Sequence, residues 1–314
     1  MDLRQLTTFL QVAELGSLSK AAERIRIAQP ALSRQMRLLE HELGVALFTR
    51  HGRGMVLTPP GERLRGRAGA ILRDLEDVRA ELIEEAGAVR GHVTVGMPPT
   101  VSGVIATRLI ERFLTQHPDV TLRIVPAFSG YLLDWLHGGE VDLAVVYGAA
   151  PPAGVRLTPM LIETLCFVAP AASAPAPHHA IRFAEVARAR LILPGPQHGL
   201  RRLVEEAARA QGLALAVAVE VDDLQVLKDL ALRGLGATVL PLAAVHEEVG
   251  SGRLAAAPIV DPPLVRKLML AEPLGRRPSN AARRFAAVLR EEVAAMVRAG
   301  TWQGQLLGDD RIPA

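Results

Sequence analysis

Apolar residues in the first sixty positions recur at helical spacing in three consecutive segments, which are interrupted at Gly16-Ser17 and before Pro30. In the third segment Leu32, Met36 and Leu39 fall on one face at about 100° per residue, together with Leu43. The opposite arc carries Pro30, Ser33, Arg34 and Arg37. One face therefore packs and the other offers hydrogen-bond donors, which predicts a helix-turn-helix whose second helix enters the major groove of DNA.

The segments 46–50 and 55–58, joined by a glycine-containing turn, predict a two-stranded hairpin. This hairpin would form a wing that brings Arg50 and Arg53 beside the helix-turn-helix. The turn Gly52-Arg53-Gly54 lacks both a Gly-x-Gly-x-x-Gly pattern and a Gly-Lys-Ser/Thr ending, so it does not predict a nucleotide site.

A longer helix is predicted after Thr58, which can cap it, with Pro59 and Pro60 in the first turn. Its apolar positions are spaced alternately four and three residues apart. They are Leu64, Ala68, Ile71, Leu75, Val78 and Leu82. A lone amphipathic helix on its own domain could show such a stripe, but strict 4-3 alternation between two domains favours pairing with a second copy of the chain. A hinge is expected over 87–92.

From residue 92 onward the pattern alternates between strands and helices, which predicts parallel sheets covered by helices. One unit is expected to contain strands at 93–96, 120–125 and 141–147 and helices at about 101–116 and 130–138. A second is expected to contain strands at 191–193, 215–221 and 237–240 and helices at about 199–211 and 223–233. Two further apolar segments, 161–169 and 264–272, are predicted to cross between the units and to leave a cleft.

Ligands of open sheets bind beyond the carboxyl ends of the strands, often at helix amino termini. The residues at such positions are Thr100, Ser102, Ser129, Gly130, Tyr147, Pro194 and His198, with Arg201 as a nearby cation. We expect them to hold a small anionic effector through local amides and through His198 or Arg201. Helix capping is the alternative role for Thr100, Ser102 and Ser129. The aromatic residues Phe128, Tyr131, Trp135 and Tyr147 cluster in this region and are more typical of a core or interface than of a ligand platform.

Length and charge support a division into a head and a body. The 314 residues suggest about two domains. Residues 1–67 carry 11 cationic and 6 anionic side chains, net +5, whereas the remainder carries 25 and 27, net −2. Of the 36 cations 33 are arginines, which grip phosphate through paired hydrogen bonds. Solvated helix faces would also account for the charge alone, but a basic head on a nearly neutral body favours nucleic-acid binding.

Several other classes of protein are disfavoured. No apolar run approaches the ~20 residues of a membrane span, and the start of the chain lacks the pattern of a signal peptide, so we expect a cytoplasmic protein without membrane contact. The single cysteine, Cys166, allows neither an internal disulfide nor a cysteine metal cluster. No Gly-x-Ser-x-Gly elbow is present, and His246-Glu247-Glu248-Val249 lacks the second histidine of a zinc helix. We therefore expect no enzyme, cofactor or metal site, and the basic head argues against a freestanding solute-binding protein.

The head resembles that of LysR-type transcriptional regulators. The resemblance lies in residues 15–22, 28–35, 39–44, 47–50 and 57–61. It implies a winged helix-turn-helix with Gln29, Pro30, Ser33, Arg34 and Arg37 on the recognition helix. It also implies a linker helix that dimerises and a two-subdomain effector domain similar to periplasmic solute-binding proteins. The implied partners are double-stranded promoter DNA, RNA polymerase, a small-molecule effector and further copies of the chain in a homodimer or homotetramer.

On this basis the expected fold is multidomain. It comprises a winged helix-turn-helix at 1–58, a linker helix at 59–88, an α/β effector domain at 91–300 and a tail at 301–314. The effector domain is expected to divide into subdomain I (about 91–162 and 268–300) and subdomain II (about 163–267). Segments around 145–147, 152–155, 161–168 and 234–241 resemble the branch of the nitrogen assimilation control protein.

Overall fold

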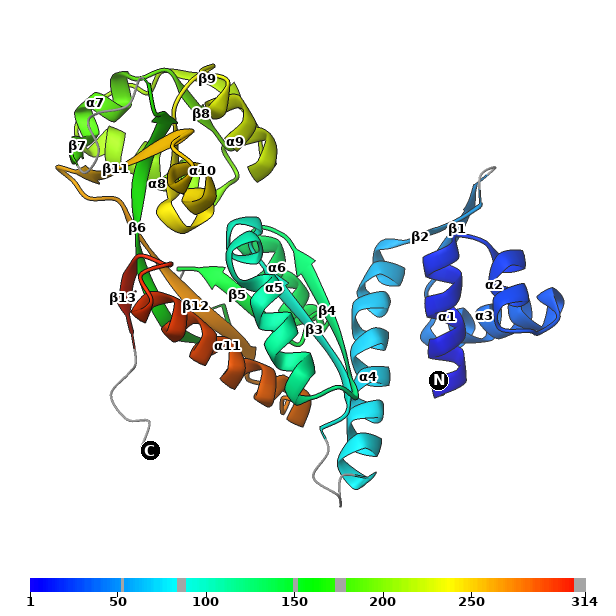
Figure 1. Ribbon diagram of the computed structural model, residues 1–314. Coiled ribbons are helices and arrows are strands. Elements are labelled where there is room, and N and C mark those ends of the chain that lie inside the picture. The colour runs from blue at the N-terminus through cyan, green and yellow to red at the C-terminus, as the bar shows by residue number, and fades with distance from the viewer. Residues whose placement is uncertain (52–53, 84–88, 149–151, 173–178, 308–314) are drawn as a thin grey trace.

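The computed structural model describes residues 1–51, 54–83, 89–148, 152–172 and 179–307. The head, at one end of the molecule in Figure 1, has a single apolar core in which the rings of Phe9 and Phe48 lie 5.3 Å apart. Its elements are α1 (Leu3–Leu15), α2 (Leu18–Arg24), α3 (Gln29–Leu43), β1 (Phe48–His51) and β2 (Gly54–Leu57), the two strands pairing antiparallel. The predicted three helices and hairpin are therefore present.

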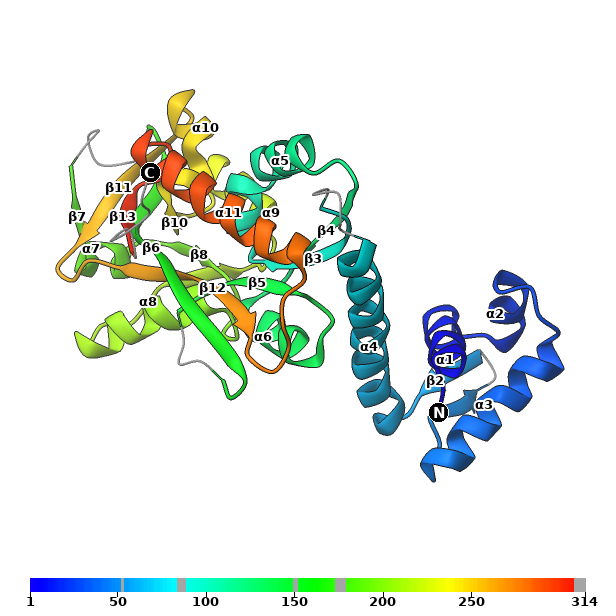
Figure 2. The same ribbon diagram turned by 90° about the horizontal axis from the view of Figure 1, so that it is seen from below.

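Helix α4 (Pro59–Ile83) runs between the head and the rest of the molecule (Figures 1 and 2). Ala68 is buried in the head core and Leu64 packs against that core. On the opposite face of α4, Gly66 and Ala70 approach the end of α6 (Ser129–Gly138). A Cβ built on Gly139 would lie 2.5 Å from the Cβ of Ala70, so small residues allow this close contact.

The first α/β unit contains a parallel arrangement of three strands. These are β3 (Gly91–Met97), β4 (Val120–Pro126) and β5 (Leu143–Tyr147), in the order β4-β3-β5. Helices α5 (Pro99–Gln116) and α11 (Asn280–Arg298) pack together over this unit, where the rings of Phe113 and Phe285 are 5.1 Å apart.

The second unit has its own core. It contains β7 (Ile181–Arg182), α7 (Phe183–Arg188), β8 (Leu191–Leu193), α8 (Gly199–Ala210), β9 (Val217–Glu220), α9 (Leu224–Leu232), β10 (Thr238–Pro241), the 3₁₀ turn Leu242–Val245, α10 (His246–Gly250) and β11 (Leu254–Val260). Strands β8 and β9 pair in parallel, as the pattern predicts.

Strands β6 (Val155–Pro170) and β12 (Val265–Pro273) connect the units. The first part of β6 pairs with β12, and its last part pairs with β10 and β11, so β6 passes from one unit into the other as predicted. The sheet order among the described residues is β4-β3-β5-β12-β6-β11-β7, with β10 and β13 (Gly304–Leu306) also on β6. Strand β12 runs antiparallel to both of its neighbours, β5 and β6, an orientation that the sequence pattern did not specify for the two crossover segments.

The assignment of 301–314 to a tail requires correction for its first part. Trp302 is only 1% exposed, and β13 pairs with β6 at Leu161–Glu163. Burial of a large indole and main-chain pairing make residues 301–307 part of the effector domain. The expected multidomain fold class is otherwise confirmed.

Candidate nucleic-acid interface and effector cleft

Helix α3 divides sharply between a buried and an exposed face. Leu32, Met36 and Leu39 are buried in the head core. On the other side Gln29, Pro30, Arg34 and Arg37 are exposed and Ser33 is half-buried. The structure therefore brings all five predicted contact residues onto the accessible part of one helix. Their donors and acceptors are available to base edges and phosphates, as recognition of a major groove requires.

The wing is held against α3 and against the turn between α1 and α2 by partly buried hydrogen bonds. The Glu40 carboxylate accepts hydrogen bonds from the backbone N–H groups of Leu47 and Phe48, at 2.8 and 3.2 Å. At the other limb, the Met55 N–H donates to the Gly16 carbonyl at 2.8 Å. Arg50, on β1, is exposed, whereas Arg53 lies outside the described residues. The wing is thus fixed in register with α3 and presents Arg50 beside it.

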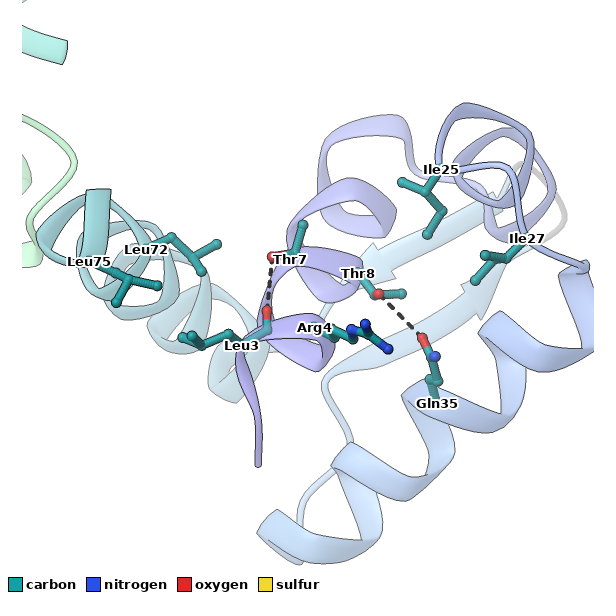
Figure 3. Close-up of a pocket in the computed structure, with 9 residues that line it drawn as sticks. All are labelled: Leu3, Arg4, Thr7, Thr8, Ile25, Ile27, Gln35, Leu72 and Leu75. Atoms are coloured by element: carbon teal, nitrogen blue, oxygen red, sulfur yellow. Dashed lines mark hydrogen bonds between the residues drawn. The ribbon is translucent and has the colours of Figure 1, made fainter. Parts of the chain in front are cut away.

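The heptad positions of α4 divide along the helix. Leu64 and Ala68 contact the head of the same chain, while Ile71 is 42% and Val78 is 50% exposed. Leu75 is half-buried and, with Leu72, faces Leu3 of α1 across a groove of about 570 Å³ (Figure 3). The side chain of Leu82 lies outside the described residues. An apolar row is therefore accessible on the second half of α4.

In the effector domain, three predicted cleft residues meet at the carboxyl ends of β3 and β5. The Thr100 and Tyr147 hydroxyls are 3.3 Å apart. The Ser129 hydroxyl accepts a hydrogen bond from the Tyr147 backbone N–H at 3.0 Å. Burial raises the pKa of Tyr147, so its phenol stays protonated at physiological pH. The hydroxyls that meet at this end of the sheet are therefore neutral.

The facing unit contributes His198, whose ring lies edge-on to Phe128 at 4.6 Å between centroids. Its Nδ1 accepts the Leu200 backbone N–H at 3.0 Å, so the proton of the neutral ring sits on Nε2. Burial, and then the positive charge of Arg266, lower the pKa of His198 to about 4. His198 is thus a neutral donor whose ring brings the second unit into contact with Phe128 of the first.

Arg201 is buried, and its guanidinium already has partners within its own unit. It donates to Glu205 at 2.6 Å, to Glu220 at 2.9 Å and to the Pro194 carbonyl at 3.2 Å. The hydrogen bond from Arg201 to the Pro194 carbonyl places Pro194 beside this guanidinium. Of the remaining predicted residues, Ser102 is half-buried and Gly130 is exposed.

The cation beside Thr100 and Tyr147 is Arg266, which the sequence analysis did not select. Its guanidinium carbon lies 3.6 Å from the centroid of the Tyr147 ring, and its Nη2 lies 3.5 Å from the Thr100 hydroxyl. It forms an ion pair with Glu163, whose other oxygen accepts the Trp302 indole N–H at 2.9 Å. Glu163 and Arg266 face each other in the β6–β12 register. The available signal was a pair of opposite charges in the two apolar crossovers, Glu163 in one and Arg266 in the other, although the second crossover also carries Lys267 and Glu272.

The aromatic residues expected in the core or at an interface take different positions. Phe128 and Tyr147 contact His198 and Arg266 at the cleft. Tyr131 is 60% exposed and lies 6.4 Å from Trp135, between ring centroids. Two of the four therefore line the region where a ligand is predicted.

The described ranges contain neither a cluster of metal ligands nor a membrane-spanning helix. Within them, no three His, Cys, Asp or Glu side chains gather as metal ligands. No helix in those ranges is long and apolar enough to cross a membrane. The buried Cys166 lies in β6, where burial raises the pKa of its thiol to about 11.

Comparison with known proteins matches both parts of the molecule. Residues 3–62 match the bacterial regulatory helix-turn-helix protein, lysR family, and residues 86–294 match the LysR substrate binding domain. The chain is 31% identical to the regulator BbuR of Bordetella bronchiseptica over 97% of this chain and 94% of that protein. It is 32% identical to the nitrogen assimilation regulatory protein nac of Klebsiella aerogenes, over 86% and 88% of the two chains.

Solved structures agree with the fold. A full-length OxyR variant from Pseudomonas aeruginosa has a TM-score of 0.74 at 25% identity and covers 99% of both chains. The regulator CbnR, solved with its target DNA, has a TM-score of 0.68 at 22% identity and covers 93% of this chain and all of its own. The sequence relatives are transcriptional regulators, in agreement with the prediction of a non-enzymatic protein. The chain belongs to the LysR family of transcriptional regulators, with a helix-turn-helix DNA-binding head and an effector-binding body.

Proposed function

We propose that this regulator binds double-stranded promoter DNA in the cytoplasm as a homodimer or homotetramer and adjusts transcription, through RNA polymerase, when a small molecule occupies the cleft. The observation that carries the DNA part is the exposed polar face of α3, whose opposite face is locked into the head core. The apolar row at Ile71, Leu75 and Val78 supports self-association, because paired copies would remove it from water.

The DNA contact is tested by Arg34→Ala and Arg37→Ala, titrated against an operator duplex and a random duplex of equal length. If the arginine contacts guanine, its removal should weaken binding to the operator alone, by about 1–3 kcal/mol. If it contacts a phosphate, its removal should weaken binding to both duplexes equally. Footprint mapping across the genome supplies the operator, and the adjacent genes name the pathway. Wild-type affinity in both variants would exclude α3 as the recognition helix.

For the effector we propose a small anion that contacts Thr100, Ser129 and His198 at the base of the cleft. Ser102, Gly130, Tyr147 and Pro194 complete its surroundings. Two hydroxyls and a neutral imidazole offer donors, and Arg266 supplies positive charge nearby. Arg201 would act through the wall that it forms with Glu205 and Glu220.

The double variant Thr100→Ala, Ser129→Ala tests this site. DNA binding in vitro should remain intact because the head is untouched, while the metabolite-dependent change in transcription should disappear. A full response to the physiological signal in this variant would refute the proposed site.

One observation favours a second mode of action, in which transcription responds to the amount of protein alone. The charge of Arg266 is already balanced by Glu163 and its guanidinium is stacked on the Tyr147 ring, so the protein's own side chains already provide partners for this cation. Equal activation with and without cellular metabolites, measured by transcription in a purified system, would support this mode over the effector-dependent one.

A further inference from the structure

The turn between α2 and α3 contains an arginine in a backbone conformation that usually requires glycine. Arg26 has a φ of +56°. Its N–H donates to the Glu23 carbonyl at 3.2 Å, and the Ile27 N–H donates to the Ala22 carbonyl at 3.0 Å. This pair of bonds is the Schellman arrangement, in which the residue at the left-handed position is most often glycine because a Cβ is disfavoured there.

The other helices of the head follow the usual rule. Helix α1 ends at Gly16 and helix α3 ends at Gly44, with φ values of 58° and 68°. Helix α2 therefore places an arginine where its two neighbours place glycine. A side chain retained at a strained position points to a role for that side chain.

No contact inside the described part of the chain accounts for this side chain. Arg26 is exposed, and no described residue forms an ion pair or a side-chain hydrogen bond with it. The nearby Arg24, by contrast, is paired with Glu14 at 3.1 Å. Among the described residues of the head, no partner of the Arg26 side chain thus offsets the strain.

The position of Arg26 relates it to the DNA interface. Two residues, Ile27 and Ala28, lie between it and Gln29, so the α-carbons of Arg26 and Gln29 are three residue steps apart and lie within about 11 Å of each other. Gln29 and Pro30 open the exposed face of α3, and Arg26 precedes them in the turn that leads into it. An arginine at the edge of a recognition helix is suited to a phosphate oxygen, which it can hold with two parallel hydrogen bonds.

We propose that Arg26 contacts the DNA phosphate backbone and sets the position of α3 without reading bases. The inference rests on the DNA binding of the head. Glycine at this position would relax the backbone but would lose the contact, so stability and affinity should change in opposite directions.

The test compares wild type with Arg26→Gly and Arg26→Lys, using the footprinted operator and a random duplex. For Arg26→Gly we expect a higher melting temperature and about fivefold weaker binding per engaged head at 0.15 M salt, equally on both duplexes. The slope of log affinity against log salt should fall in magnitude by about 0.9 per head. Arg26→Lys keeps the strain and the charge, and should keep most of the wild-type slope.

Arg209→Ala is the matched control. It removes an exposed arginine from α8, which lies in the unit remote from the head (Figure 1), and should leave affinity and slope unchanged. Unchanged binding by a more stable Arg26→Gly variant would overturn the proposal. So would a loss confined to the operator, since that indicates base reading. If wild type bound neither duplex, the DNA binding of the head would itself be refuted.

Discussion

At the scale of single residues, His198 links burial, charge and the cleft. Because its pKa is lowered to about 4, the folded protein keeps this imidazole neutral, whereas an exposed histidine titrates near 6.5. The unfolded chain therefore binds more protons between these two values. The stability that the folded protein gains from keeping the His198 ring neutral is therefore complete above about pH 6.5, and it is lost as the pH falls toward 4.

We predict that His198→Asn removes the loss of stability that His198 causes as the pH falls. Asparagine can still cap α8 by accepting the Leu200 N–H, so the helix start is preserved. Between pH 7 and pH 5, urea unfolding of wild type should lose about 2 kcal/mol more than that of the variant. Carboxylates elsewhere in the chain titrate in both proteins, so their effect on stability cancels when wild type and the variant are compared. Parallel pH profiles for the two proteins would contradict the prediction.

The same residues show what the sequence could and could not indicate. Thr100, Ser129 and Tyr147 could be selected from the sequence because each lies at or shortly after the end of a predicted strand, which is a local property. Arg266 could not be selected in this way, because its position is set by its ion pair with Glu163, which lies 103 positions earlier in the sequence and faces it across the β6–β12 pairing. Arg201 was chosen for its charge, but its carboxylate partners become evident only once α8 and β9 are placed side by side.

At the scale of elements, α4 uses different faces for different neighbours. One face contacts the head through Leu64 and Ala68, and the opposite face contacts α6 through Gly66 and Ala70. The contact with the head could not be distinguished within the heptad pattern, because an apolar stripe does not indicate whether its partner belongs to the same chain or to another copy. The contact with α6 gives almost no hydrophobic pattern in the sequence, because it depends on residues with little or no side chain.

We predict that Gly139→Ala loosens the contact between α4 and the effector domain. Its φ of +76° disfavours any side chain, and the added methyl would lie 2.5 Å from the Ala70 methyl. A loss of roughly 2 kcal/mol in unfolding free energy is expected from the combined strain and overlap. Calorimetry can compare it with Gly103→Ala, in the exposed interior of α5, which should stabilise its helix by up to about 1 kcal/mol. Equal melting of Gly139→Ala and wild type would contradict the close contact.

At the scale of the whole molecule, the accessible row on α4 determines how copies can assemble. Ile71 and Val78 are exposed, so charges placed there should not disturb the folded chain. We predict that the double variant Ile71→Glu, Val78→Glu sediments as a monomer, because carboxylates would face one another across an apolar interface. Operator affinity should fall with the loss of the second head.

Val226→Glu provides the control for that experiment. Val226 is 45% exposed on α9, and the substitution places a carboxylate on an exposed apolar position away from α4. It should sediment as wild type does. If the α4 double variant also keeps the wild-type sedimentation coefficient, the copies associate through another surface.

The placement of β12 between β5 and β6 has a consequence for biosynthesis. When the ribosome has made residue 162, the first unit still lacks its central strand, α11 and the Trp302 segment, which come from residues 265–307. At about 5–20 residues per second, completing that remainder takes on the order of 10 s. The second unit, whose strands and helices lie between residues 165 and 260, can fold during this interval. The nascent chain meanwhile exposes the unpaired edges of β5 and β6, so chaperone binding should concentrate there during translation and end when the carboxyl terminus emerges.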